Sequence, residues 1–198
     1  ISSAISILKK ITDMNWKMSM EVLNFEVGRY VAQILLARTY LLRQDYESAS
    51  NVLKKIPAII NSKYTTSVGV SLLHITGELE LAKENFSSER CKDVFNELLI
   101  TAQKISLPMW QIRAHYGLAR IFNKISDILN SERHFKLSLE LIDNILNNID
   151  EKHRQLFLNK PEIKSIYSDY EKLKQEMTKE DSNKTIILEM IKKVLKTE

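Results

Sequence analysis

Apolar residues recur along most of this 198-residue chain at spacings of three and four, the pattern of helices that bury one face. The pattern stops at short polar segments and restarts after a residue type that commonly caps a helix. Three restarts align as Asp45-x3-Ala49-x3-Leu53-x2-Ile56, Ser87-x3-Cys91-x3-Phe95-x2-Leu98 and Asp127-x3-Ser131-x3-Phe135-x2-Ser138. They follow one another at intervals of 42 and 40 residues. This period predicts stacked helical hairpins, because no single hairpin can bury its apolar face alone.

The same pattern predicts the bounds of the helices. Residues 1–14 have the spacing of the second helix of a hairpin whose first helix is missing, and because the chain opens at Ile1 we expect it to be a piece of a longer protein. The three expected hairpins pair residues 20–43 with 46–60, 67–83 with 88–105, and a helix that begins at Pro108 with 128–146.

The period stops after Asp150. Two further amphipathic segments are expected at residues 162–177 and 185–196, separated by the polar residues 179–184. The first of them can close the end of the stack. The predicted fold class is therefore all-α, an α-solenoid with repeats over residues 1–150 and C-terminal capping and linker helices over residues 151–198.

Two pairs of motifs carry a resemblance to a known family. They are Leu36-Ala37-x2-Tyr40 followed by Ala49-x3-Leu53, and Leu118-Ala119-x2-Phe122 followed by Phe135-x2-Ser138. They resemble tetratricopeptide repeats (TPR), whose pattern is Leu-Gly-x2-Tyr followed by Ala-x3-Phe over about 34 residues. This chain departs from that pattern in its longer repeats, in Leu79 and Ala82 of the second repeat, and in Ser131 of the third.

Longer repeats of this kind are similar to those of large bacterial signalling proteins, in which a TPR array lies between a nucleotide-binding switch module and a regulatory output module. The segment His153-Arg154-Gln155-Leu156-Phe157-Leu158-x2-Pro161 resembles the end of such arrays, and residues 187–198 resemble the lead-in helix of a GAF-type sensor domain. The resemblance implies a non-enzymatic interaction and signal-relay module of a transcription regulator, kinase or cyclase. A stand-alone peptide-binding adaptor is the first alternative, and a fragment of an enzyme or nucleic-acid-binding protein whose active portion lies elsewhere is the second.

Charge and composition limit the kinds of partner and the location that we expect for this chain. The chain has 29 Lys and Arg against 25 Asp and Glu, and no basic block of the kind that binds nucleic acid. Cys91 is the single cysteine, which excludes an intrachain disulfide. No apolar run is long enough to span a membrane, and the N-terminal residues lack a signal-peptide pattern. We therefore expect a cytoplasmic protein without a membrane partner.

The residues that often carry catalysis do not form a recognisable constellation. The four histidines, His74, His115, His134 and His153, are too far apart in sequence for a local metal motif, and we interpret them as packing or surface residues. Glu78, Glu80 and Glu84 share one expected helix and are interpreted as solvated. The glycines Gly28, Gly69, Gly77 and Gly117 are isolated within helical patterns, so they form no phosphate loop. We expect no enzymatic activity, cofactor or metal.

The repeat register instead predicts a binding surface on the first helices of the hairpins. Its candidate residues are Ile34, Arg38, Leu41, Thr76, Glu80, Lys83, Arg113, Tyr116, Arg120 and Lys124. Because the set includes Arg38, Arg113, Arg120 and Lys124, the expected partner is a protein or peptide of acidic character, or a neighbouring domain of the same polypeptide. The apolar stripe within residues 184–198 is expected either to fold back on residues 162–177 or to form a homodimer with a second chain.

Overall fold

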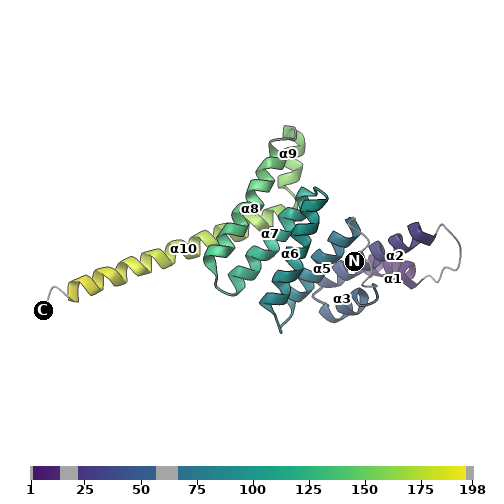
Figure 1. Cartoon of the computed structure of the whole chain (residues 1–198), viewed down its shortest axis with the longest axis horizontal. Coiled ribbons are helices and arrows are strands. Elements are labelled where there is room, and N and C mark those ends of the chain that lie inside the picture. The colour runs from purple at the N-terminus through teal and green to yellow at the C-terminus, as the bar shows by residue number, and fades with distance from the viewer. Residues whose placement is uncertain (1, 14–21, 57–66, 195–198) are drawn as a thin grey trace.

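The computed structural model describes residues 2–13, 22–56 and 67–194, and these residues form helices and turns without strands. The helices are α1 (Ser2–Asp13), α2 (Val22–Leu42), α3 (Tyr46–Leu53), α5 (Ser67–Ala82), α6 (Ser88–Lys104), α7 (Pro108–Lys124), α8 (Ile128–Leu146), α9 (Glu151–Leu158) and α10 (Pro161–Val194). Helices α1 to α8 follow one another in a row, and α10 runs out of this body toward the C-terminal end (Figure 1). The fold is therefore all-α, as the periodicity predicted.

The expected caps begin three of these helices. The side chains of Asp45, Ser87 and Asp127 each accept a hydrogen bond from the backbone N–H three residues later, at 3.1, 3.4 and 3.3 Å. Each bond satisfies one of the backbone donors that a helix start leaves without a partner. Pro108 stands in the first turn of α7, where its missing N–H costs nothing.

Three turns that connect the helices share one backbone geometry. Gln44, Ser106 and Ser126 have positive φ angles of 60°, 52° and 62°. After each of them, the next backbone N–H donates to a carbonyl five residues earlier. These bonds run from Asp45 to Tyr40, from Leu107 to Ala102 and from Asp127 to Phe122. This left-handed ending satisfies a carbonyl at the end of the preceding helix and reverses the chain within a few residues.

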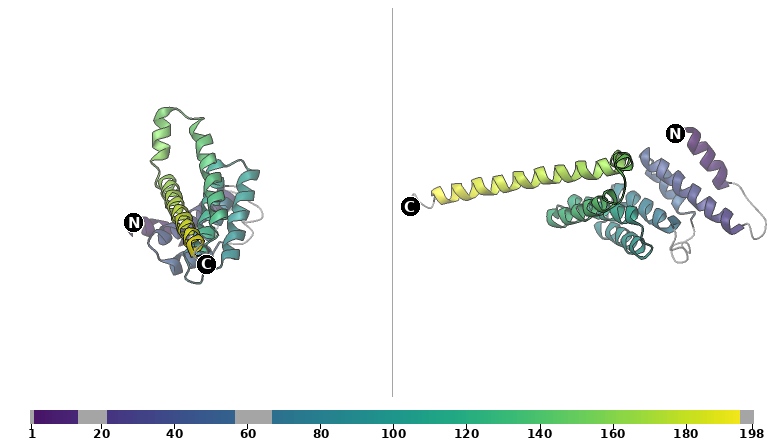
Figure 2. Two further views of the ribbon diagram at one scale, coloured as in Figure 1. Left: turned by 90° about the vertical axis from the view of Figure 1, so that its left-hand side faces the viewer. Right: turned by 90° about the horizontal axis from the view of Figure 1, so that it is seen from above.

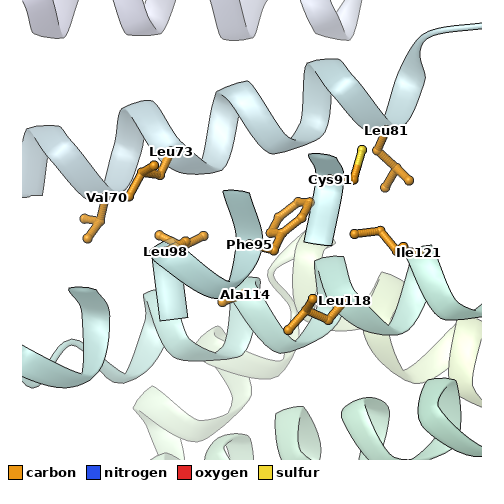
Figure 3. Close-up of a cluster of buried hydrophobic side chains, with 9 residues drawn as sticks. All are labelled: Val70, Leu73, Leu81, Cys91, Phe95, Leu98, Ala114, Leu118 and Ile121. Carbon is orange, nitrogen blue, oxygen red and sulfur yellow. The ribbon is translucent and has the colours of Figure 1, made fainter. Parts of the chain in front are cut away.

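A cluster of fully and nearly fully buried side chains joins α5, α6 and α7 (Figure 3). Phe95 lies within this group and is fully buried. Its ring touches the backbones of two neighbouring helices, because a Cβ atom built on Gly77 or Gly117 would lie only 2.7 or 2.2 Å from ring atoms. The two glycines therefore make room for the large residue of the second repeat.

The hydrophobic core does not stop at residue 150, where the sequence predicts the end of the repeats, but continues into α10. Phe135 and Ile142 of α8 share a cluster with Ile163, Ile166 and Leu173 of α10. Phe135 is buried, as the repeat register predicted. The proximal part of α10 therefore covers an apolar face of the last hairpin.

Two buried serines of α8 also join it to α7. Ser131 donates from its hydroxyl to the Ala119 carbonyl at 3.0 Å, and Ser138 donates to the Ile112 carbonyl at 3.3 Å. Both hydroxyls are buried with a partner, which avoids the cost of an unsatisfied polar group. Serine thus fits the small-residue position of the third repeat.

The expected helix bounds are wrong at two places. Helix α3 ends at Leu53 rather than near residue 60, and residues 57–66 lie outside the described part of the chain. The polar residues 179–184 do not separate two helices, because α10 is continuous from Pro161 to Val194. Figure 2 shows the distal part of this helix extending beyond the body. The expected return of this segment onto residues 162–177 is therefore wrong, since no turn interrupts the helix.

Candidate binding pocket

A pocket of about 500 Å³ opens between α2, α5, α7 and the proximal part of α10. Five residues of the predicted surface contribute to its lining, namely Arg38, Leu41, Arg113, Tyr116 and Arg120. The structure thus brings together side chains from the first and third expected hairpins. Residues of α10 form the remaining wall, which the sequence had not indicated.

Arg113 connects α7 to this wall. Its Nε donates to Glu162 Oε2 at 3.1 Å, and its Nη2 donates to Glu162 Oε1 at 3.0 Å. The guanidinium also lies over the ring of Trp110, 4.3 Å from the ring centre. A two-point contact of this kind fixes the orientation of both side chains. The positive charge of Arg113 is therefore neutralised within the chain.

Arg120, two turns farther along the same side of α7, is also paired with a carboxylate. Its Nη1 donates to both carboxylate oxygens of Glu78 in α5, at 2.8 and 2.9 Å. Burial raises the pKa of Glu78, but the charge of Arg120 and the hydrogen bonds that it donates outweigh burial and hold this pKa below its ordinary value. Glu78 is thus an ionised partner inside the pocket, and the prediction that it is simply solvated is wrong.

Tyr116 makes the third polar contact across the pocket. Its hydroxyl donates to Asp169 Oδ2 of α10 at 2.7 Å. Burial, followed by this hydrogen bond, raises the pKa of Tyr116, so its hydroxyl keeps its proton. Asp169 also accepts from Lys172 at 2.9 Å, which balances its charge.

His74 lines the pocket as a neutral group. Burial lowers its pKa to about 4, although the Glu78 carboxylate lies only 3.8 Å from its Nε2. The loss of hydration on burial therefore outweighs the attraction of one nearby anion. The ring meets Trp110 edge to face, at 5.7 Å between ring centres. At neutral pH His74 can offer a hydrogen bond to a ligand but no charge.

Arg38 is the arginine of the lining that makes no direct contact with a carboxylate. Arg113 and Arg120 each pair with a carboxylate, whereas Arg38 is exposed and makes no hydrogen bond or ion pair within the described residues. Leu42, one turn after Arg38 in α2, and Tyr46 of α3 also line the pocket, with exposed fractions of 77% and 37%. This part of the pocket therefore offers one cation next to accessible apolar surface.

The other predicted surface residues lie outside the lining. Ile34 is only 5% exposed and packs in the cluster between α2 and α5, so its place on a binding surface is wrong. Lys83 pairs with Glu80 three residues before it, and Thr76 is half-buried nearby in α5. Lys124 donates to the Leu81 carbonyl at 3.1 Å and lies over the Phe86 ring. Five of the ten residues that the repeat register placed on the binding surface therefore do not line the pocket.

Sequence reasoning missed the acidic side chains of α10. Glu162 and Asp169 are seven residues apart, a spacing that places both on one side of a helix. The seven-residue spacing can be read from the sequence, but it does not show against which helix this side of α10 packs.

A second unpredicted contact joins α7 to α8. His115 and His134 approach to 3.0 Å between their Nδ1 atoms, and His134 stacks on Phe122. Burial lowers the pKa of both histidines, to about 4 for His115. Within the described residues no group of three or more metal-ligating side chains comes together. The contact is therefore a packed pair of neutral rings.

No protein-family model, curated protein or solved structure matches the chain. Among the described helices, none has both the length and the apolar content that crossing a membrane requires.

Proposed function

We propose that this chain is a non-enzymatic, TPR-like interaction module that holds a segment of a partner protein in the pocket between α2, α5, α7 and α10. The observation that carries the proposal is Arg38, an exposed cation that forms no hydrogen bond or ion pair among the described residues, in a lining that also contains the exposed side chains of Leu42 and Tyr46. Arginine and tyrosine are among the residue types that contribute most to binding in protein interfaces.

The repeat register supports a solenoid of TPR-like hairpins. The small-residue positions Ala49, Cys91 and Ser131 are all fully buried, and so is Phe95 at a large-residue position. The three capping residues begin helices at the expected positions. The small-residue positions of the three repeats therefore have equivalent environments, as repeated units would require.

The pairing of charges refines the expected ligand. Glu162 and Glu78 already neutralise Arg113 and Arg120, and Asp169 also lines the pocket, so a strongly acidic peptide would meet the carboxylates of the pocket itself. A ligand with one carboxylate next to an apolar side chain fits better, because it can pair with Arg38 and cover Leu42. We propose this chemistry for the partner segment.

The position of α10 supports a relay role. One wall of the pocket belongs to α10, which Arg113 and Tyr116 tie to α7. A bound segment would therefore contact both the body and the helix that leaves it. This arrangement suits a module that links two parts of a bacterial multidomain regulator, the architecture that the sequence resemblance implies.

The proposal is tested by selection of random peptides displayed on phage against the whole chain. We expect the selected peptides to share an acidic residue beside an apolar one. Their affinity for the Arg38→Glu variant should fall at least about tenfold, because the charge reversal places two anions together. Isothermal titration calorimetry with the synthetic peptides measures the change.

The matched control is Lys164→Glu, which makes the same change of charge at an exposed site of α10 outside the pocket lining. Its peptide affinity should stay close to that of the unsubstituted chain. Peptides without a shared acidic residue, or an equal loss of affinity in both variants, would contradict the pocket as the binding site.

A further inference from the structure

Helix α10 carries a seven-residue register along its whole length. Its proximal positions are residues 163, 166, 170, 173 and 177, and all five side chains belong to the core cluster of α8 or pack against it. Ile163, Ile166 and Leu173 are almost fully buried there. The proximal part of this stripe is therefore covered by the body of the same chain.

The same register continues past the body. Its next positions are Glu180 and Lys184, followed by Ile187, Ile191 and Val194. Apolar residues at the first and fourth positions of a heptad are the pattern of a helix that packs on another helix. The two charged positions separate a stretch that the body covers from a second apolar stretch.

The distal stretch cannot fold back on residues 162–177, because α10 is one continuous helix as far as Val194. At 1.5 Å per residue, Val194 lies about 25 Å farther along the helix than Met177. Figure 1 and the right-hand view of Figure 2 show the distal segment extending away from the body.

We propose that the distal part of α10 pairs with the same segment of a second copy of this chain. The apolar stripe is self-complementary, since identical heptad positions meet when two such helices pack together. Residues 179–194 contain four lysines and three acidic residues, so their charges nearly balance. Self-pairing therefore meets little repulsion, and the segment has no excess charge that would select an oppositely charged partner. This inference does not depend on the peptide pocket.

The test is sedimentation equilibrium of the whole chain over a range of concentrations. We expect the mass to rise from that of one chain toward that of two. Ile187→Asp should abolish this rise, because it places a charge on the stripe. Ile186→Asp is the matched control, since the helical register places residue 186 far from the centre of the stripe.

Circular dichroism of both variants checks that the helices are retained. A chain that stays monomeric at every concentration overturns the inference. So does a dimer that Ile187→Asp leaves intact, or one that both substitutions abolish equally.

Discussion

At the scale of single residues, two glycines decide how the second and third hairpins pack. A glycine inside a helix costs about 1 kcal/mol relative to alanine, so Gly77 and Gly117 lower the intrinsic stability of α5 and α7. They are offset by Phe95, whose ring occupies the space that their missing side chains leave. The helical pattern of the sequence gives no reason for glycine at these two positions. The structure gives one, because a larger residue at either position would collide with the Phe95 ring.

We expect Gly117→Ala to lower the free energy of unfolding by about 1–3 kcal/mol, because the new Cβ would lie 2.2 Å from an atom of the buried Phe95 ring. Urea denaturation measures the change. Gly28→Ala is the control, since nothing lies within 4 Å of the new Cβ there, and it should leave stability unchanged or raise it by up to about 1 kcal/mol.

Adding Phe95→Leu to Gly117→Ala should restore part of the loss, because the smaller side chain relieves the contact and the two changes are then not additive. Equal urea midpoints for Gly117→Ala and Gly28→Ala would contradict the packing of the ring against this backbone.

At the scale of elements, the turns repeat a geometry that their side chains do not favour. Gln44, Ser106 and Ser126 adopt left-handed backbone angles, which glycine adopts without the steric cost that a Cβ imposes. The hydrogen bonds and caps around them hold this geometry. The turns therefore leave room for stabilising substitutions.

Gln44→Gly should raise the free energy of unfolding by about 0.5–1 kcal/mol, because it removes the strain of the positive φ angle. The same substitution at Gln103, an exposed helical position near the end of α6, should lower it by about as much. Thermal and urea unfolding of the two variants gives opposite signs if the turn geometry is correct. A loss of stability in both would mean that Gln44 is not held in the left-handed region.

Helix α10 shows that a polar run is not a helix break. Residues 179–184 contain no glycine or proline, and Lys and Glu are good helix formers. The run indicates only that this part of the helix has no apolar face. The prediction of a helix boundary at residues 179–184 was wrong because it took a polar segment for a break in the helix.

At the scale of the whole molecule, burial of histidines couples stability to pH. Burial lowers the pKa of His74 and of His115 from 6.5 to about 4. Glu78 faces His74, while His134 and Arg133 face His115, and neither environment compensates for burial. Both histidines are neutral in the folded protein at neutral pH.

We expect stability to fall as the pH drops from about 6.5 to about 4, because the unfolded chain binds protons in this range before the folded chain does. The loss is at most about 3 kcal/mol for each histidine. Urea midpoints measured across this range test it, and His115→Gln should flatten the dependence. The lowered pKa of Glu78 adds its own loss only below about 4.5. A constant urea midpoint between pH 6.5 and 4 would contradict the lowered histidine pKa values.

The sequence by itself determined the helical class, the positions of the caps and the buried small and large residues of the repeats. Asp45 and Asp127 begin helices, and Phe95 and Phe135 are buried, as the pattern predicted. These features depend on residues three or four positions apart, which a helix always brings to the same side. Local spacing is therefore sufficient to predict them.

Only the tertiary structure decided which faces meet. Arg120 pairs with Glu78, which lies 42 positions earlier in the sequence, and Arg113 pairs with Glu162, 49 positions later. Ile34 is buried because α5 packs against the side of α2 on which it lies. The sequence pattern shows that a helix has a face but not which neighbour covers it. The charge that the pocket presents to a ligand depends on these ion pairs. The sequence predicted a basic surface, but in the lining that the structure describes Arg38 is the arginine that forms no ion pair.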